Sequence, residues 1–146
     1  MDLDINIQSF LWEDVRALDA WRVFFERLLN PISVETGEIS LALIDDAKMQ
    51  ILNSQYRHKN KPTNVLSFPS LAPKMCLGDV VLSFETIQNE ATDQGKTFDD
   101  HVSHLFLHGI LHLMGYDHET EKDRLEMELK EIEILKDLGI RDPYDS

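Results

Sequence analysis

The sequence predicts a single α+β domain spanning residues 1–146, with roughly four strands and about five helices. A chain of 146 residues is long enough for one hydrophobic core and too short for two. Segments with the two-residue period of a strand alternate along the chain with segments that have the 3.6-residue period of a helix. The sequence shows no internal repeat or low-complexity linker that would divide the chain.

The first half of the chain is expected to hold two strands and two helices. Polar and apolar residues alternate over 2–8, the pattern of a half-buried strand. Apolar residues then recur at helical spacing over 14–29, and Pro31 follows the expected end of that helix. The run 39–44 reads as a second strand, and a short amphipathic helix after it is expected to end at Arg57.

The second half is expected to supply two buried strands and three helices. The strands are short apolar runs flanked by proline or glycine, at 64–68 and 80–82. Helical patterns follow over 84–94, 98–114 and 120–138.

Composition restricts the classes of function. A net charge of −13 argues against a broad surface for binding phosphate, although residues 57–61 hold three bases, Arg57, Lys59 and Lys61, and no acid. Cys76 is the only cysteine, so an intrachain disulfide is impossible and a reducing compartment fits. The N-terminus lacks the pattern of a secretory signal, and no apolar run approaches the ~20 residues that cross a bilayer. We therefore expect a cytoplasmic protein without a membrane partner.

One run of residues predicts a metal centre. His108 and His112 are four residues apart, which places both rings on one face of a helix. Gly115 can adopt the left-handed conformation that ends a helix, and His118 follows directly after that turn. Three histidines without a fourth ligand nearby describe a zinc site with an open position, which is typical of catalysis. We expect one Zn²⁺ per chain.

The other histidines of this helix are expected to bind no metal. His104 and His112 would be ~12 Å apart along the helix axis, too far for both to contact one ion. Only the pair at 108 and 112 is followed by a turn that delivers a third histidine, so His104 is expected to support or pack beside the site.

The spacing His-x-x-x-His-x-x-Gly-x-x-His matches that of metzincin metallopeptidases except at one position. Those enzymes carry a glutamate, the general base, directly after the first histidine, and this chain has Gly109 there. Peptidase chemistry is therefore not expected. We expect the glycine to leave room for a phosphate or ribose beside the metal.

With this glycine, the motif over 108–118 resembles the signature of the YbeY family. Two further segments resemble the same family, one over 52–69 and one over 77–83. The family consists of zinc-dependent, single-strand-specific endoribonucleases of ribosomal RNA maturation and ribosome quality control. The resemblance implies a zincin-like fold, zinc on three histidines, ribosomal RNA precursors as substrate, and the ribosomal subunit or its associated proteins as partners. One departure is Asn60, where the family usually has aspartate.

The resemblance also marks two candidate catalytic residues. Arg57 occupies the position of a functionally important arginine, and a guanidinium stabilises the negative charge that builds on phosphate oxygens during hydrolysis. Asp79 resembles a family aspartate near the cleft, where it would orient a ligand histidine or the water, or only cap a turn.

Two other functions stay open at this stage. The absent glutamate and the acidic composition also suit a ribosome-associated assembly factor with a mainly structural zinc. A zinc hydrolase acting on a substrate other than RNA is the third hypothesis. A fourth protein ligand on the metal would favour the structural zinc.

Overall fold

Four strands form one mixed sheet in the computed structural model, which describes residues 2–32, 38–71 and 76–144. Their spatial order is β1-β2-β4-β3, so β1 and β3 are the edge strands. β2 pairs in parallel with both β1 and β4, whereas β3 pairs with β4 in the antiparallel sense. The strands are β1 (Asp2–Ile7), β2 (Glu38–Ile44), β3 (Val65–Pro69) and β4 (Gly78–Ser83).

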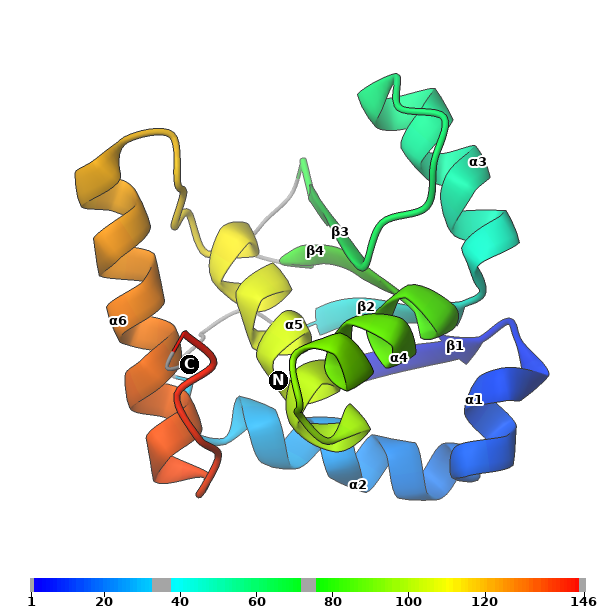
Figure 1. Ribbon diagram of the computed structural model, residues 1–146, viewed down its shortest axis with the longest axis horizontal. Helices are drawn as coiled ribbons and strands as arrows, with labels where there is room; N and C mark the ends of the chain where they lie inside the picture. The colour runs from blue at the N-terminus through cyan, green and yellow to red at the C-terminus, as the bar shows by residue number, and fades with distance from the viewer. Residues whose placement is uncertain (1, 33–37, 72–75, 145–146) are drawn as a thin grey trace.

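The described residues form six helices, and α5 is the central one. It crosses the sheet and contacts β3, β4, α2, α4 and α6, while α3 lies to one side, near the β3 edge of the sheet (Figure 1). The helices are α1 (Phe10–Val15), α2 (Leu18–Leu29), α3 (Asp46–Arg57), α4 (Phe84–Asp93), α5 (Phe98–Leu113) and α6 (Glu121–Asp137).

The two faces of the sheet carry two separate apolar clusters. Val80 and Leu82 of β4 belong to the main core with the buried residues of α2, α5 and α6. Val81 lies between them in sequence and packs instead with Met49 of α3 in a smaller cluster. Successive side chains of a strand point to opposite faces, so α5 and α3 cover opposite sides of the sheet. This arrangement decides which predicted residues can meet.

The predicted α+β class with four strands is confirmed, and one helix boundary is wrong. The helix expected over 14–29 begins only at Leu18, as α2. A separate short helix that was not expected, α1, ends at Val15, and the two residues between them, Arg16 and Ala17, are extended. Tertiary contacts explain the break. The guanidinium of Arg16 pairs with Asp99 of α5 and lies 4.5 Å from the ring centre of Trp21. A regular helix through Arg16 would lose these long-range contacts, which local periodicity does not reveal.

None of the helices in the described part of the chain is long and apolar enough to cross a membrane.

Candidate metal centre

Helix α5 places the first two predicted ligands. Thr97 begins the helix, and its side chain accepts a hydrogen bond from the backbone N–H of Asp100 at 3.1 Å. The helix ends at Leu113, and Gly115 has a φ of +101°, a conformation that glycine adopts without strain. The chain reverses there and brings His118 back beside the last two turns, as the sequence predicts.

The three predicted histidines converge. His108, His112 and His118 each offer a ring nitrogen, and these nitrogens all lie within 4.8 Å of one another. The Nε2 atoms of His108 and His112 are 3.1 Å apart. Two ligands bound tetrahedrally at about 2.0–2.1 Å from zinc would be separated by about 3.3 Å, so the pair has the spacing that one ion needs.

Hydrogen bonds on the far side of each ring fix which nitrogen can bind a metal. Nδ1 of His112 donates to the carbonyl of Tyr116 at 3.1 Å, and Nδ1 of His108 donates to Oε1 of Glu131 at 2.5 Å. Each Nδ1 therefore carries the proton, which leaves Nε2 with a free lone pair directed at the cluster. The donor set thus fits a divalent metal that prefers imidazole.

Glu131 contacts the histidine cluster, which its place in the sequence did not predict. It lies on α6 with a fully buried side chain, and its carboxylate accepts hydrogen bonds from His108, His104 and Tyr144. Burial raises the pKa of this carboxyl, but the hydrogen bonds from His104 and His108 outweigh it and lower the pKa to about 2. A signal was present, because Glu131 occupies the same helix face as the buried Met127 and Ile134.

The surroundings of His112 and His104 favour their neutral form. Burial lowers the pKa of His112, and repulsion from His108 and His118 lowers it further. Burial likewise lowers the pKa of His104, against the opposing effect of Glu131. Neutral imidazole is the form that binds a metal, so this environment favours binding at neutral pH.

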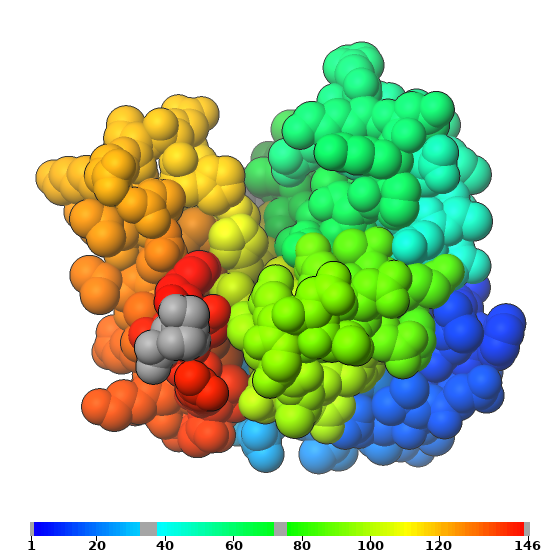
Figure 2. Space-filling model, in the orientation of Figure 1, coloured from blue at the N-terminus to red at the C-terminus, as the bar shows by residue number. Residues whose placement is uncertain are grey.

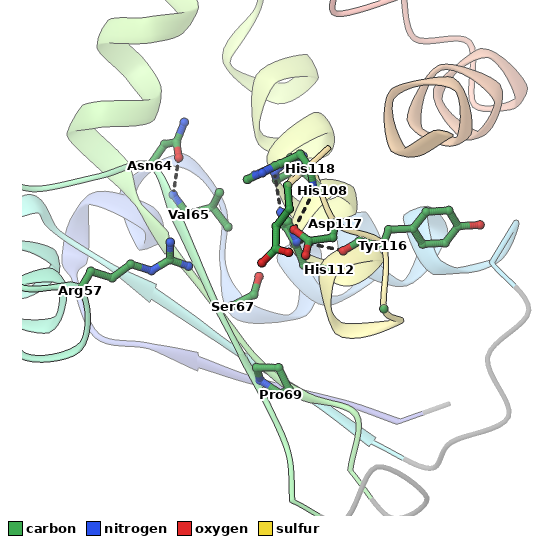
Figure 3. A pocket seen from close by; sticks show the side chains of 12 residues that line it. Arg57, Asn64, Val65, Ser67, Pro69, His108, His112, Tyr116, Asp117 and His118 are labelled. Carbon is green, nitrogen blue, oxygen red and sulfur yellow. Dashed lines mark hydrogen bonds between the residues drawn. The ribbon is translucent and has the colours of Figure 1, made fainter. Parts of the chain in front are cut away.

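The cluster lines one side of a cleft, and Arg57 lines the other. The cleft has a volume of about 670 Å³ and is visible as the hollow between α3 with β3 and the segment after α5 (Figure 2). Arg57 ends α3 and points across the edge strand β3 toward the histidines (Figure 3). Its side chain forms no hydrogen bond or ion pair with any other residue that the structure describes. It is therefore free to bind an anion.

Comparison with known proteins assigns the family. Residues 10–139 match the family described as endoribonuclease YbeY. The chain belongs to this family. The protein named endoribonuclease YbeY from Bartonella quintana is 44% identical, over 97% of this chain and 96% of its own length. That of Rhodopseudomonas palustris is 42% identical, over 97% of this chain and 80% of its own length.

A solved structure supports the fold. The solution structure of TM1509 from Thermotoga maritima matches with a TM-score of 0.60, over 99% of this chain and 97% of that one. At 21% sequence identity this likeness shows a shared fold alone.

Asp79, the second predicted catalytic residue, does not lie near the three clustered histidines. Asp79 precedes Val80 on β4, so its side chain points to the opposite face of the sheet from α5. There it lines a separate hollow with Tyr56 and Phe68, beside α3. The strand period that buries Val80 thus removes the geometric basis for a role of Asp79 in orienting a ligand histidine.

Other residues of the two motifs are also placed. Lys59 and Lys61 are exposed and do not line the histidine cleft. Asp117 lines the cleft, and its Oδ1 accepts the backbone N–H of His118 at 2.7 Å, so it stabilises the turn that presents this ligand.

Gly109 has a different purpose from the one expected. It is buried, and a Cβ atom there would lie 3.0 Å from Oγ of Ser67 and 3.0 Å from a methyl group of Val80. The missing side chain makes room for the sheet, and it does not open space beside the metal. The glycine lets α5 pack closely on strands β3 and β4, which a side chain at this position would push away.

Proposed function

We propose that this protein is a zinc-dependent endoribonuclease that cleaves single-stranded RNA, with His108, His112 and His118 as ligands of one zinc ion and Arg57 as the phosphate-binding residue. The observation that carries the proposal is the cleft in which three imidazole nitrogens face a guanidinium that has no partner among the described residues. Family membership supports the reaction class. We assign the activity to residues 1–146 as one domain.

The three histidines would bind the zinc ion and fix its position in the cleft. Nε2 of His108 and Nε2 of His112 are available because their Nδ1–H groups are used by Glu131 and by the Tyr116 carbonyl. A bound zinc ion supplies a Lewis acid for phosphate oxygens and lowers the pKa of water toward neutrality. The three imidazoles, the third presented by the turn at Gly115, would hold the ion at the cleft, within reach of a strand bound there.

Arg57 acts on the phosphate. Its guanidinium is planar and permanently charged, and it offers paired N–H donors to two non-bridging oxygens. These oxygens gain negative charge as the phosphodiester is cleaved, so donors already in place stabilise the transition state more than the bound substrate. The exposed position of Arg57 leaves the guanidinium accessible to a strand entering from solvent.

A set of only three protein ligands in the described part of the chain favours a catalytic over a structural zinc. Among residues 2–32, 38–71 and 76–144, no histidine, cysteine or carboxylate joins the three histidines as a fourth member of their group. A second group that could hold a metal consists of His104, His108 and Glu131. It would use Nδ1 of His108, the nitrogen that faces Glu131, and it is largely buried. An assembly factor with a closed zinc site is therefore the weaker hypothesis.

The substrate is proposed from the size of the cleft and from the family. A volume of about 670 Å³ lies within the roughly 300–1,000 Å³ range of pockets for small ligands, which suits a short stretch of one extended strand rather than a duplex. Ribosomal RNA precursors are the proposed natural substrate, with a ribosomal subunit or its associated proteins as partners. Cytoplasmic action is proposed with them.

The test is cleavage of a labelled single-stranded RNA by zinc-loaded protein, with its annealed duplex as a second substrate. His112→Ala protein purified in the same way controls for contaminating ribonuclease. We expect cleavage of the single strand by the parent protein alone and little cleavage of the duplex. Equal cleavage by the parent and the His112→Ala protein would contradict the proposal.

A further inference from the structure

The last described residues of the chain close over the side of the metal centre that faces away from the cleft. After α6 the chain turns at Gly139, which has a φ of +78°, and returns along the helices (Figure 2, red beside the orange α6). Ile140 packs against the main core, and the ammonium group of Lys96 donates to the carbonyl of Pro143 at 3.1 Å. This segment is thereby fixed to the body of the protein.

A single buried carboxylate connects this segment to a metal ligand. The hydroxyl of Tyr144 donates a hydrogen bond to Oε2 of Glu131, and Nε2 of His104 lies 3.1 Å from the same oxygen. The other oxygen, Oε1, accepts the Nδ1–H of His108 at 2.5 Å. The side chain of Glu131 has no exposed surface, so these three groups, rather than bulk water, satisfy it.

We propose that Tyr144 and Glu131 are positioning residues of the metal centre, in which Tyr144 fixes the carboxylate and the carboxylate fixes the ring orientation and the tautomer of His108. The inference rests on the metal centre of the proposed function and extends it to the C-terminal segment. Neither residue touches the cleft.

The reason is geometric. The carboxylate of Glu131 can rotate about its side-chain torsions unless both oxygens are held. Tyr144 and His104 hold Oε2 from one side, which directs Oε1 at His108. Without that constraint His108 also populates the tautomer protonated at Nε2, which directs an N–H instead of a lone pair at the ion.

The first measurement is zinc affinity, by competition with a chromophoric chelator. The variants are Tyr144→Phe and Glu131→Gln, and the matched controls are Tyr56→Phe and Glu133→Gln, which change exposed residues outside the centre. Removing a partner of a ligand histidine costs about 10–100-fold in metal affinity, and we expect this for Glu131→Gln. Tyr144 is one hydrogen bond further from His108 than Glu131 is, so for Tyr144→Phe we expect zinc affinity to fall by up to about 10-fold. Neither control should change the affinity.

The second measurement separates positioning from a structural role. Long-range ¹H–¹⁵N correlations of the histidine rings in zinc-free protein report the tautomer directly. We expect a single Nδ1–H form for His108 in the parent and a mixture of tautomers in Tyr144→Phe.

Three results would overturn the inference. Zinc affinity of Tyr144→Phe equal to that of Tyr56→Phe would show that the tyrosine does not act on the centre. Lower affinity with an unchanged tautomer and a lower thermal midpoint would show that it only stabilises the fold. A parent protein that binds no zinc would overturn both this inference and the metal centre. The first two results concern Tyr144 only. If the parent protein binds zinc and cleaves RNA, either of them would leave the proposed function intact.

Discussion

The two walls of the cleft differ in how firmly their polar side chains are held. On the α5 wall, the metal-binding face of His108 and His112 is fixed by hydrogen bonds to Glu131 and to the Tyr116 carbonyl. On the α3 wall, Arg57 is exposed and unpaired within the described residues. A metal site must exist before substrate arrives, so its ligands are held in advance. An arginine that already forms an ion pair would have to break that pair before it could bind a phosphate.

The contrast also explains where sequence and structure disagree. The α5 wall depends on buried partners distant in the chain, such as Glu131 of α6, 23 residues after His108. The α3 wall depends on topology, because β3 is an edge strand and the end of α3 can reach around it. Each wall can therefore be altered separately by substitution.

Removing two ligands is expected to abolish the α5 wall. The double variant His108→Ala/His112→Ala should bind no zinc and cleave no RNA, because His118 alone cannot hold an ion. Metal analysis by mass spectrometry after exhaustive dialysis measures the first effect. An undiminished zinc content would contradict the assignment of the ligands.

Removing the arginine should damage the α3 wall alone. Arg57→Ala should reduce RNA cleavage by about 10²–10³-fold, the usual cost of one transition-state donor, while zinc content stays at one per chain. Arg57→Lys should recover only part of the rate, because an ammonium group is not a planar fork. Single-turnover cleavage measures both, with the exposed Arg27→Ala on α2 as a matched control. Cleavage by Arg57→Ala at the parent rate would show that the two walls do not act together.

A substitution where α5 packs on the sheet should destabilise the fold rather than create a peptidase. Gly109→Glu would place a carboxylate against Ser67 and Val80, and we expect a loss of at least about 3 kcal/mol in the free energy of unfolding. RNA cleavage should fall with stability, and no peptidase activity should appear. Urea unfolding, together with assays on single-stranded RNA and casein, gives the answer. A stable variant that cleaves RNA normally would mean that α5 does not pack on the sheet as closely as described.

Acid should weaken zinc binding at the α5 wall. Burial lowers the pKa of His112 below its ordinary value of about 6.5, so protons compete with zinc for this ligand on the acid side of that value. Zinc affinity is expected to be constant between about pH 7 and 8 and to decrease below about pH 6. Chelator competition across this range measures it, and Arg57→Ala should show the same profile. Affinity already falling between pH 8 and 7 would mean that the pKa of a ligand histidine is raised.

Much of the centre could be predicted from local sequence. His108, His112, Gly115 and His118 lie on one helix and its turn, where spacing alone determines geometry. The four strands follow equally from local patterns of polarity. Arg57 was found through family resemblance, since its position beside the cleft depends on elements that do not adjoin α5 in the chain.

Tertiary structure alone decided the rest. The pairing of Glu131 with His108 and of Tyr144 with Glu131 required α6 and the C-terminal segment to pack on α5. The sheet directed Asp79 to the face of α3. Spacing within one element is set by covalent geometry and is readable from sequence. Which groups meet across elements is set by how the hydrophobic faces of those elements bury one another, which no local pattern contains.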